Sequence, residues 1–190
     1  ASSSCYGIPD EFPTKETSGP NPGSPYALQK LCVERYCELF YNEYGLETLS
    51  LRYFNVFGPR QRFDLQYSAV IASFVGSLAS GTNPVIYGSG EQFRDFTYVD
   101  NVVDANLLAA SSDGTSCGQE INIGCGEKTS INDLCNIICN KPAKYFDVRP
   151  GDVFGSLADI SRANSLIGYN PRVNLNDGIK KTIDWYLSNL

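Results

Sequence analysis

The sequence predicts an α/β fold built on a largely parallel sheet. Short apolar segments that suit buried strands alternate along the chain with segments whose apolar residues recur at helical spacing. Internal repeats and low-complexity segments are absent, and no apolar run approaches the ~18 residues of a membrane helix. We therefore expect no membrane partner. A length of 190 residues suits one domain, or one domain with a lobe.

Local signals place the elements along the chain. The first helix is expected from Pro25, a favoured first helical residue, to Gly45, a usual helix stop. Thr129 or Ser130 is expected to cap a helix that runs to residue 139, and Asn176 to cap the last helix. The chain opens in a strand-like run. Further helices are expected over 68–79 and 101–110, and strands over 48–54, 85–87, 96–98 and 121–123.

Charge and cysteine content exclude several classes of function. A formal net charge of −6 argues against a surface that coats nucleic acid, although a few placed arginines can still bind an anionic small ligand. The first residues lack the basic and apolar segments of a signal peptide. Seven cysteines without a CxxC pair, in a chain without histidine, favour reduced thiols in a cytoplasmic protein over a metal site or disulfides.

One pair of residues points to catalysis. Tyr26 and Lys30 form a YxxxK pattern at the start of the first expected helix, and residues four apart lie on the same helix face. A free phenol is a poor base at neutral pH, but a nearby cation favours the phenolate and so readies it to take a proton. Taken alone, the pattern is usually only a packed ring beside a solvated charge.

Four further motifs accompany this pair in a fixed order. A serine run precedes Tyr6 and Gly7, and the later motifs are RYFNVFGPRQ at 52–61, YGSGEQFRDFTYVD at 87–100 and RPGDV at 149–153. Together they resemble the nucleotide-sugar 4-epimerases of the extended short-chain dehydrogenase family, and the likeness covers essentially the whole chain. The resemblance implies the C-terminal part of a Rossmann-type doubly wound sheet plus a small α/β substrate-binding lobe. Residues 1–68 and 97–124 would belong to the sheet, and residues 69–96 and 125–190 to the lobe.

The same resemblance implies NAD as cofactor and assigns the catalytic residues. Tyr26 would be the base, and Lys30 would bind the ribose of NAD and favour the phenolate. Tyr53 would join both residues in binding the cofactor. The catalytic hydroxyl would come from the serine run, where the spacing to Tyr26 favours Ser2 or Ser3.

The substrate residues implied are those of a UDP-sugar site. Asn55, Arg94 and Arg149 would hold the diphosphate, since two guanidiniums can each bind its oxygens bidentately, although a lone arginine is more often in a surface ion pair. Asp152 would contact the ribose of the nucleoside. Ser156 would line the sugar pocket, where a small residue admits an N-acetyl group, unless it is only a loop serine. UDP-GlcNAc and UDP-GalNAc are therefore expected substrates, with UDP-glucose and UDP-galactose as a further pair.

The serine run also narrows the reaction. Related dehydratases and decarboxylases carry a carboxylate just before the Tyr-Gly segment, where this chain has Ser3, Ser4 and Cys5. Epimerisation needs no such acid, because it requires only oxidation at C4, rotation of the keto sugar and return of the hydride. A homodimer through the YxxxK helix is a further implication of the resemblance.

One part of the family pattern is missing. The glycine-rich GxxGxxG turn that binds the NAD pyrophosphate does not occur, and the chain contains no methionine. We therefore expect that the N-terminal strands and this turn are absent, and that this chain alone binds NAD weakly. Two functions stay open: the catalytic and substrate-binding part of an NAD-dependent UDP-sugar 4-epimerase, or a non-catalytic nucleotide-sugar-binding or interaction module.

Overall fold

Parallel pairing dominates the strands, as the alternation of apolar segments predicts. The computed structural model describes residues 1–62, 69–149 and 151–189. Within these ranges β4 (Phe93–Arg94) pairs antiparallel with β7 (Thr129–Ser130), whereas the other pairs are parallel. The parallel pairs are β1 (Ser50–Tyr53) with β6 (Glu120–Ile123), β2 (Val56–Phe57) with β5 (Thr97–Tyr98), and β3 (Val85–Tyr87) with β8 (Lys144–Phe146).

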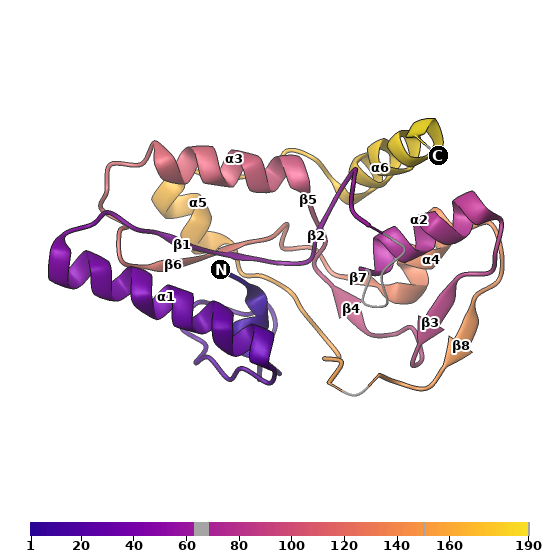
Figure 1. The fold of residues 1–190 in the computed structure, drawn as a ribbon, viewed down its shortest axis with the longest axis horizontal. Helices are drawn as coiled ribbons and strands as arrows, with labels where there is room; N and C mark the ends of the chain where they lie inside the picture. The colour runs from indigo at the N-terminus through magenta and orange to yellow at the C-terminus, as the bar shows by residue number, and fades with distance from the viewer. Residues whose placement is uncertain (63–68, 150, 190) are drawn as a thin grey trace.

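Helices cover both faces of the β1–β6 pair. Alternate residues of a strand point to opposite faces, so Leu51 packs in one core while Arg52 faces the other way. The Leu51 face meets α3 (Val99–Ala110) and α5 (Ser161–Ile167), and the Arg52 face meets α1 (Pro25–Tyr44), as Figure 1 shows. The α/β expectation is thus confirmed.

A second group of helices forms a core of its own. It consists of α2 (Val70–Ser80), α4 (Ile131–Ile138) and α6 (Leu175–Asn189), at the end of the molecule that carries β3 and β8 (Figure 1). Residues of these helices pack with Phe57, Ile86 and Tyr98 of the neighbouring strands. The residue limits of sheet part and lobe stay a prediction. The helix α5 packs against β6 and α3, although its residues were counted with the lobe.

Caps mark the start or the end of several helices. The Ser24 hydroxyl accepts a hydrogen bond from the Ala27 amide at 3.1 Å before α1, and Gly45 ends α1 with φ +66°. Of the two candidate caps for α4, Ser130 is the one, since it accepts from the Asp133 amide at 3.0 Å.

One expectation about the ends of the chain was wrong, and the strand-like start holds only at Ser2. The helix α6 begins at Leu175, so Asn176 lies inside it, and Asn174 accepts the capping hydrogen bond from the Asp177 amide at 2.9 Å. At the start of the chain Ser2 forms a parallel bridge with Tyr53, but the next residues form a 3₁₀ turn, η1 (Ser3–Tyr6). The Ser2 side chain caps that turn, which explains why the strand stops there. None of the helices within the described ranges has the length and apolar character that a membrane crossing requires.

A buried polar network fixes α1 to the sheet. Arg52 donates to the carboxylate of Glu34 on α1 at 2.7 and 3.0 Å, and to the Tyr6 hydroxyl at 2.9 Å. That hydroxyl donates in turn to Asn122 on β6 at 2.7 Å. Burial alone would lower the pKa of Arg52, but its hydrogen bond to Glu34 carries the pKa above the ordinary value, so the guanidinium stays charged. Tyr26, two turns earlier on α1, is thereby held in a fixed position.

Candidate active site

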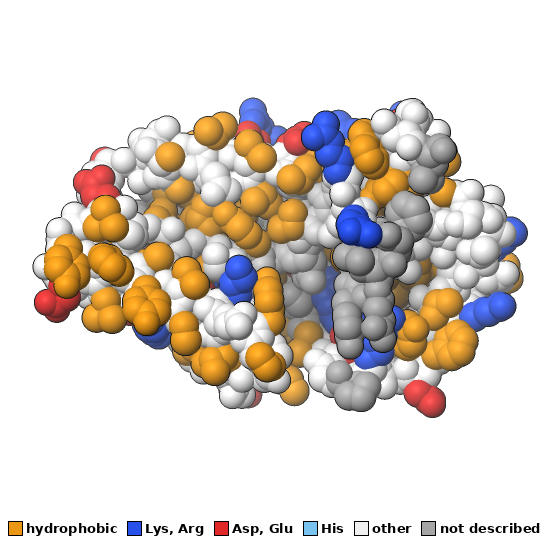
Figure 2. Space-filling model, viewed as in Figure 1, with side chains coloured by type: hydrophobic (Ala, Val, Ile, Leu, Met, Phe, Trp, Pro, Cys, Tyr) orange, Lys and Arg blue, Asp and Glu red, His pale blue; other side chains and the backbone are white. Residues whose placement is uncertain are grey.

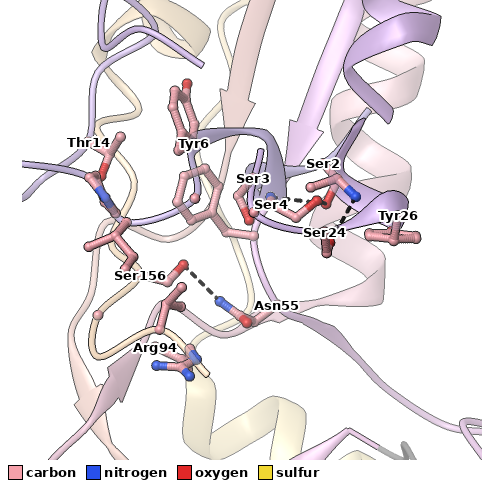
Figure 3. A pocket seen from close by; sticks show the side chains of 18 of the residues that line it. Ser2, Ser3, Ser4, Tyr6, Thr14, Ser24, Tyr26, Asn55, Arg94 and Ser156 are labelled. Atoms are coloured by element: carbon pink, nitrogen blue, oxygen red, sulfur yellow. Dashed lines mark hydrogen bonds between the residues drawn. The ribbon is translucent and has the colours of Figure 1, made fainter. Parts of the chain in front are cut away.

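A cavity of about 830 Å³ opens beside the start of α1. Its walls come from the serine run, the first turn of α1, the end of β1 and the loop that follows residue 150, as Figure 3 shows in part. All the site residues that the sequence predicts line it except Lys30 and Arg149. Those that do are Ser2, Ser3, Tyr26, Tyr53, Asn55, Arg94, Asp152 and Ser156.

The expected catalytic side chains lie at one end of this cavity. Tyr26 stands in the first turn of α1, because Ser24 caps the helix and Pro25 begins it, and its side chain is 55% exposed. Lys30 lies beside it, with Nζ 5.6 Å from the centre of the Tyr26 ring, as the spacing of four predicts. Lys30 itself is half-buried and lines neither this cavity nor the second one described below.

The two candidate serines differ in what they already bind. Ser2 accepts hydrogen bonds from the amide of Ser4 at 3.2 Å and from its hydroxyl at 2.9 Å, so it also serves as the cap of η1. Ser3 lines the cavity from within the turn. Tyr53 reaches the same cavity, and its hydroxyl donates to Asn106 on α3 at 3.0 Å.

The expected substrate residues lie at the other end. Asn55 follows β1 with a φ of +27°, a conformation that asparagine tolerates better than most residues. In this position its Nδ2 donates to the backbone oxygen of Asp95 at 3.1 Å and to the hydroxyl of Ser156 at 3.2 Å, the contact drawn in Figure 3. Ser156 is half-buried and faces the cavity.

Arg94 stands where two cavities meet. Its Nη1 donates to the backbone oxygens of Phe93 at 2.8 Å and Phe154 at 3.2 Å, while Nη2 lies 3.3 Å from the carboxylate of Asp152. Burial lowers the pKa of Arg94, and the Asp152 carboxylate opposes that change. The guanidinium is therefore held by backbone oxygens on one side and keeps a partly exposed counter-ion on the other.

A second cavity of about 270 Å³ continues from this point. It shares Asn55, Arg94 and Asp152 with the first cavity and extends between α2 and β3. Arg149 lines it, with its guanidinium carbon 3.7 Å from the centre of the Tyr87 ring. The two arginines expected to bind one diphosphate thus lie along a continuous path from Tyr26 to Tyr87.

One site residue escaped the reading of the sequence. The carboxylate of Asp95 is fully buried and accepts three backbone hydrogen bonds from distant segments, at Cys125, Gly126 and Ala158. Burial raises the pKa of Asp95 to about 6, while the three amides oppose the rise. Its place beside Arg94, as an acid between buried aromatic residues, is the only sequence signal that could have marked it.

The fold and this site are of the short-chain dehydrogenase type, with a YxxxK helix beside a parallel sheet and an arginine-lined cleft. Comparison with known proteins gives the same result. The chain belongs to the NAD dependent epimerase/dehydratase family, whose sequence model matches residues 1–124.

Several relatives are similar along the whole chain. A putative UDP-glucose 4-epimerase of Methanocaldococcus jannaschii is 39% identical over 97% of this chain and 60% of its own length. A UDP-N-acetylglucosamine 4-epimerase from Methanobrevibacter ruminantium M1, solved with UDP-N-acetylmuramic acid, is 42% identical with a TM-score of 0.95, over 100% of this chain and 62% of that one. The UDP-glucuronic acid 4-epimerase from Bacillus cereus, solved with UDP-glucuronic acid and NAD, is 31% identical with a TM-score of 0.91, over 100% of this chain and 60% of that one.

These comparisons confirm the family, its dependence on NAD and the α/β fold that the motifs imply. They also set the extent of the likeness, since the chain spans only 60% to 62% of the length of these relatives.

Proposed function

We propose that this chain is the catalytic and substrate-binding part of an NAD-dependent UDP-sugar 4-epimerase. The observation that carries the proposal is the single cavity that joins the Tyr26 phenol and the serine hydroxyls to Asn55, Arg94 and Ser156. A volume of about 830 Å³ suits a drug-sized ligand, and the polar groups stand at both of its ends.

The residues present fit the nicotinamide end of NAD. Tyr26 is exposed to the cavity, Lys30 holds a cation beside its ring, and Tyr53 lines the wall next to them. When bound, NAD supplies a hydride acceptor and donor for carbon C4 of the sugar. The chain's own part is proton transfer: the Tyr26 phenolate takes the proton of the C4 hydroxyl and later returns it. Ser3 or Ser2 holds that hydroxyl by a hydrogen bond.

The nucleotide end of the substrate follows from the path of the two cavities. A sugar beside Tyr26 and Ser156 places the diphosphate at Arg94, where the cavities join. The nucleoside then extends into the second cavity toward Tyr87, and Arg149 lies over the Tyr87 ring. Asp152, which is exposed and shared by both cavities, can accept a hydrogen bond from the ribose hydroxyls.

The small side chain of Ser156 supports N-acetylated substrates. Its hydroxyl already accepts from Asn55, so its position in the wall of the large cavity is fixed. The similarity to a UDP-N-acetylglucosamine 4-epimerase favours the same choice. We therefore propose UDP-GlcNAc and UDP-GalNAc as the preferred pair, with UDP-glucose and UDP-galactose also accepted.

The surface of α1 supports a homodimer. Figure 2 shows apolar side chains gathered over this helix, and large ones are exposed at Leu28, Val33, Tyr36, Leu39, Phe40 and Tyr44. Single apolar residues are normal on a monomer surface, whereas a contiguous apolar face of this kind is typical of an interaction site. Comparing the sedimentation of the wild type with that of Tyr36→Glu tests the proposed homodimer. We also propose a cytoplasmic location, because all seven cysteines are free thiols.

Calorimetric titration with UDP tests the function directly. We expect binding by the wild type, a loss of roughly tenfold in Arg94→Ala and in Arg149→Ala, and no change in Arg35→Ala, whose side chain pairs with Glu38 on the exposed face of α1. A wild type that binds no UDP would overturn the proposal. Binding of both NAD and UDP-sugars without interconversion would instead favour the non-catalytic binding module.

A further inference from the structure

The carboxylate of Asp95 joins two segments that are far apart in the sequence. Its Oδ1 accepts from the Cys125 amide at 2.8 Å, and its Oδ2 accepts from the amides of Gly126 at 2.9 Å and Ala158 at 3.1 Å. A buried carboxylate with three such partners is firmly placed, because losing it would leave three backbone donors without this partner, among them the buried amide of Ala158.

The backbone around Asp95 is shaped to admit this carboxylate. Gly124 has no side chain, and a Cβ atom there would lie 2.6 Å from Oδ2 of Asp95 and 2.7 Å from the Cβ of Ala158. Gly126 adopts φ +70°, which turns its amide toward the same oxygen. The loop and the acid therefore fit together only in this arrangement.

Asp95 also acts on the cavity through its main chain. Its backbone oxygen accepts from Nδ2 of Asn55 at 3.1 Å, and the same amide donates to Ser156 at 3.2 Å. Ser156 stands two residues before Ala158, which the carboxylate holds. One residue thus holds Asn55, which lines both cavities, and the segment that carries Ser156 at the sugar end of the large cavity.

The nucleotide end is held by other contacts. Arg94 is fixed by the backbone oxygens of Phe93 and Phe154, and Arg149 lies over Tyr87. Loss of the Asp95 carboxylate should therefore shift the sugar end and leave the nucleotide end in place.

We infer that Asp95 is a positioning residue whose carboxylate, through Ala158, sets Ser156 for the sugar of the UDP-sugar substrate, while its backbone oxygen holds Asn55 independently of the carboxylate. The inference rests on the proposed function and adds to it a residue that shapes the sugar end without touching the sugar. The inference predicts that loss of the Asp95 carboxylate weakens binding of the sugar part of the ligand and leaves binding of the UDP part unchanged.

The test compares UDP with UDP-GlcNAc in calorimetric titrations of the 190-residue chain. Asp95→Asn keeps the size of the side chain but turns an NH₂ group toward a backbone amide. We expect its UDP affinity to stay within about twofold of the wild type and its UDP-GlcNAc affinity to fall roughly tenfold, the scale of one well-placed polar contact.

Asn101→Ala is the matched control. Asn101 is also fully buried, and its Oδ1 accepts from the amides of Arg172 and Val173, both at 3.0 Å, but it lines neither cavity. We expect it to lower the melting temperature without changing the ratio of the two affinities. Equal losses for both ligands in Asp95→Asn, or a ratio like that of the control, would overturn the inference and leave the proposed function intact. A wild type that binds neither ligand would refute the proposed function itself.

A measurement on the wild type covers the case in which Asp95→Asn does not fold. Hydrogen exchange at the amides of Cys125, Gly126 and Ala158 reports directly on the carboxylate that they bind. We expect UDP-GlcNAc to slow exchange at these amides more than UDP does. Identical protection by the two ligands would overturn the inference.

Discussion

Asn55 donates a hydrogen bond from its amide nitrogen to the hydroxyl of Ser156, 3.2 Å away, across 101 positions of sequence. The contact joins the end of β1 to the loop after residue 150. Because both side chains face the large cavity, the space for the sugar depends on two parts of the chain at once.

Replacing Ser156 with tyrosine is expected to select between substrate pairs. In Ser156→Tyr the phenol fills the volume that an acetamido group needs, and overpacking of this kind costs ~1–3 kcal/mol. We expect affinity and turnover for UDP-GlcNAc to fall about tenfold or more, while the values for UDP-glucose change less. Both pairs must be assayed side by side, since selectivity is a difference of affinities. Equal losses would mean general damage, and no loss would make Ser156 a bystander.

Replacing Tyr26 with phenylalanine is expected to abolish epimerase activity and to leave UDP binding intact. The phenol is the proposed base, and general acid–base groups contribute ~100-fold or more to the rate. In a protein that carries this chain and binds NAD, Tyr26→Phe should therefore lose at least that much epimerase activity and keep its UDP affinity within about twofold. Tyr36→Phe, an equally exposed tyrosine on the same helix, should retain full activity. A loss of less than tenfold in Tyr26→Phe would exclude it as the base.

The buried ion pair between Glu34 and Arg52 predicts a large difference in stability. Glu34→Ala leaves the guanidinium of Arg52, only 2% exposed, without its carboxylate, and breaking such a pair costs about 3–5 kcal/mol. Glu38→Ala breaks an exposed pair with Arg35 on the same helix and should cost at most about 1 kcal/mol. Urea denaturation of both variants measures the contrast. Similar midpoints would show that the buried pair stabilises α1 no more than a surface pair does.

Burial of Asp95 predicts a specific pH dependence of stability. Its pKa is raised to about 6 in the folded protein from an ordinary value of 3.8, so between these values the folded state binds more protons than the unfolded state. The stability that Asp95 contributes is thus present at acidic pH and lost as pH rises through about 6. Relative to Asp95→Asn, the wild type should gain up to about 3 kcal/mol of unfolding free energy from pH 7 to pH 4. Nearby Glu127, which helps to raise this pKa, is common to both proteins. If the unfolding free energies of the wild type and Asp95→Asn change in parallel with pH, the raised pKa of Asp95 is contradicted.

Local signals in the sequence predicted much of the fold. Proline and glycine marked both ends of α1, and a serine marked the start of α4, because these residues act on the backbone next to them. The turn η1 was missed because a single side chain, Ser2, ends the strand there. The short strands β4, β7 and β8 were not expected, since segments of two or three residues have no periodicity and depend on distant partners.

The site likewise contains contacts that the sequence predicts and contacts that it does not. The YxxxK spacing predicts where Lys30 lies relative to Tyr26, because both are on one helix. By contrast, nothing in the sequence alone indicates that Arg149 lies over Tyr87 or that Asp95 binds amides 30 to 63 positions away. Such contacts are set by the packing of separate elements.

Residues near both ends of the chain meet at the cavity. The Thr14 amide donates to the backbone oxygen of Leu157 at 2.7 Å, and the Asp159 amide donates to that of Thr14 at 2.9 Å. Contacts between segments so distant in sequence close a large loop and form slowly compared with helices. A refolding chain should therefore regain its helical content before it regains a cavity able to hold a ligand.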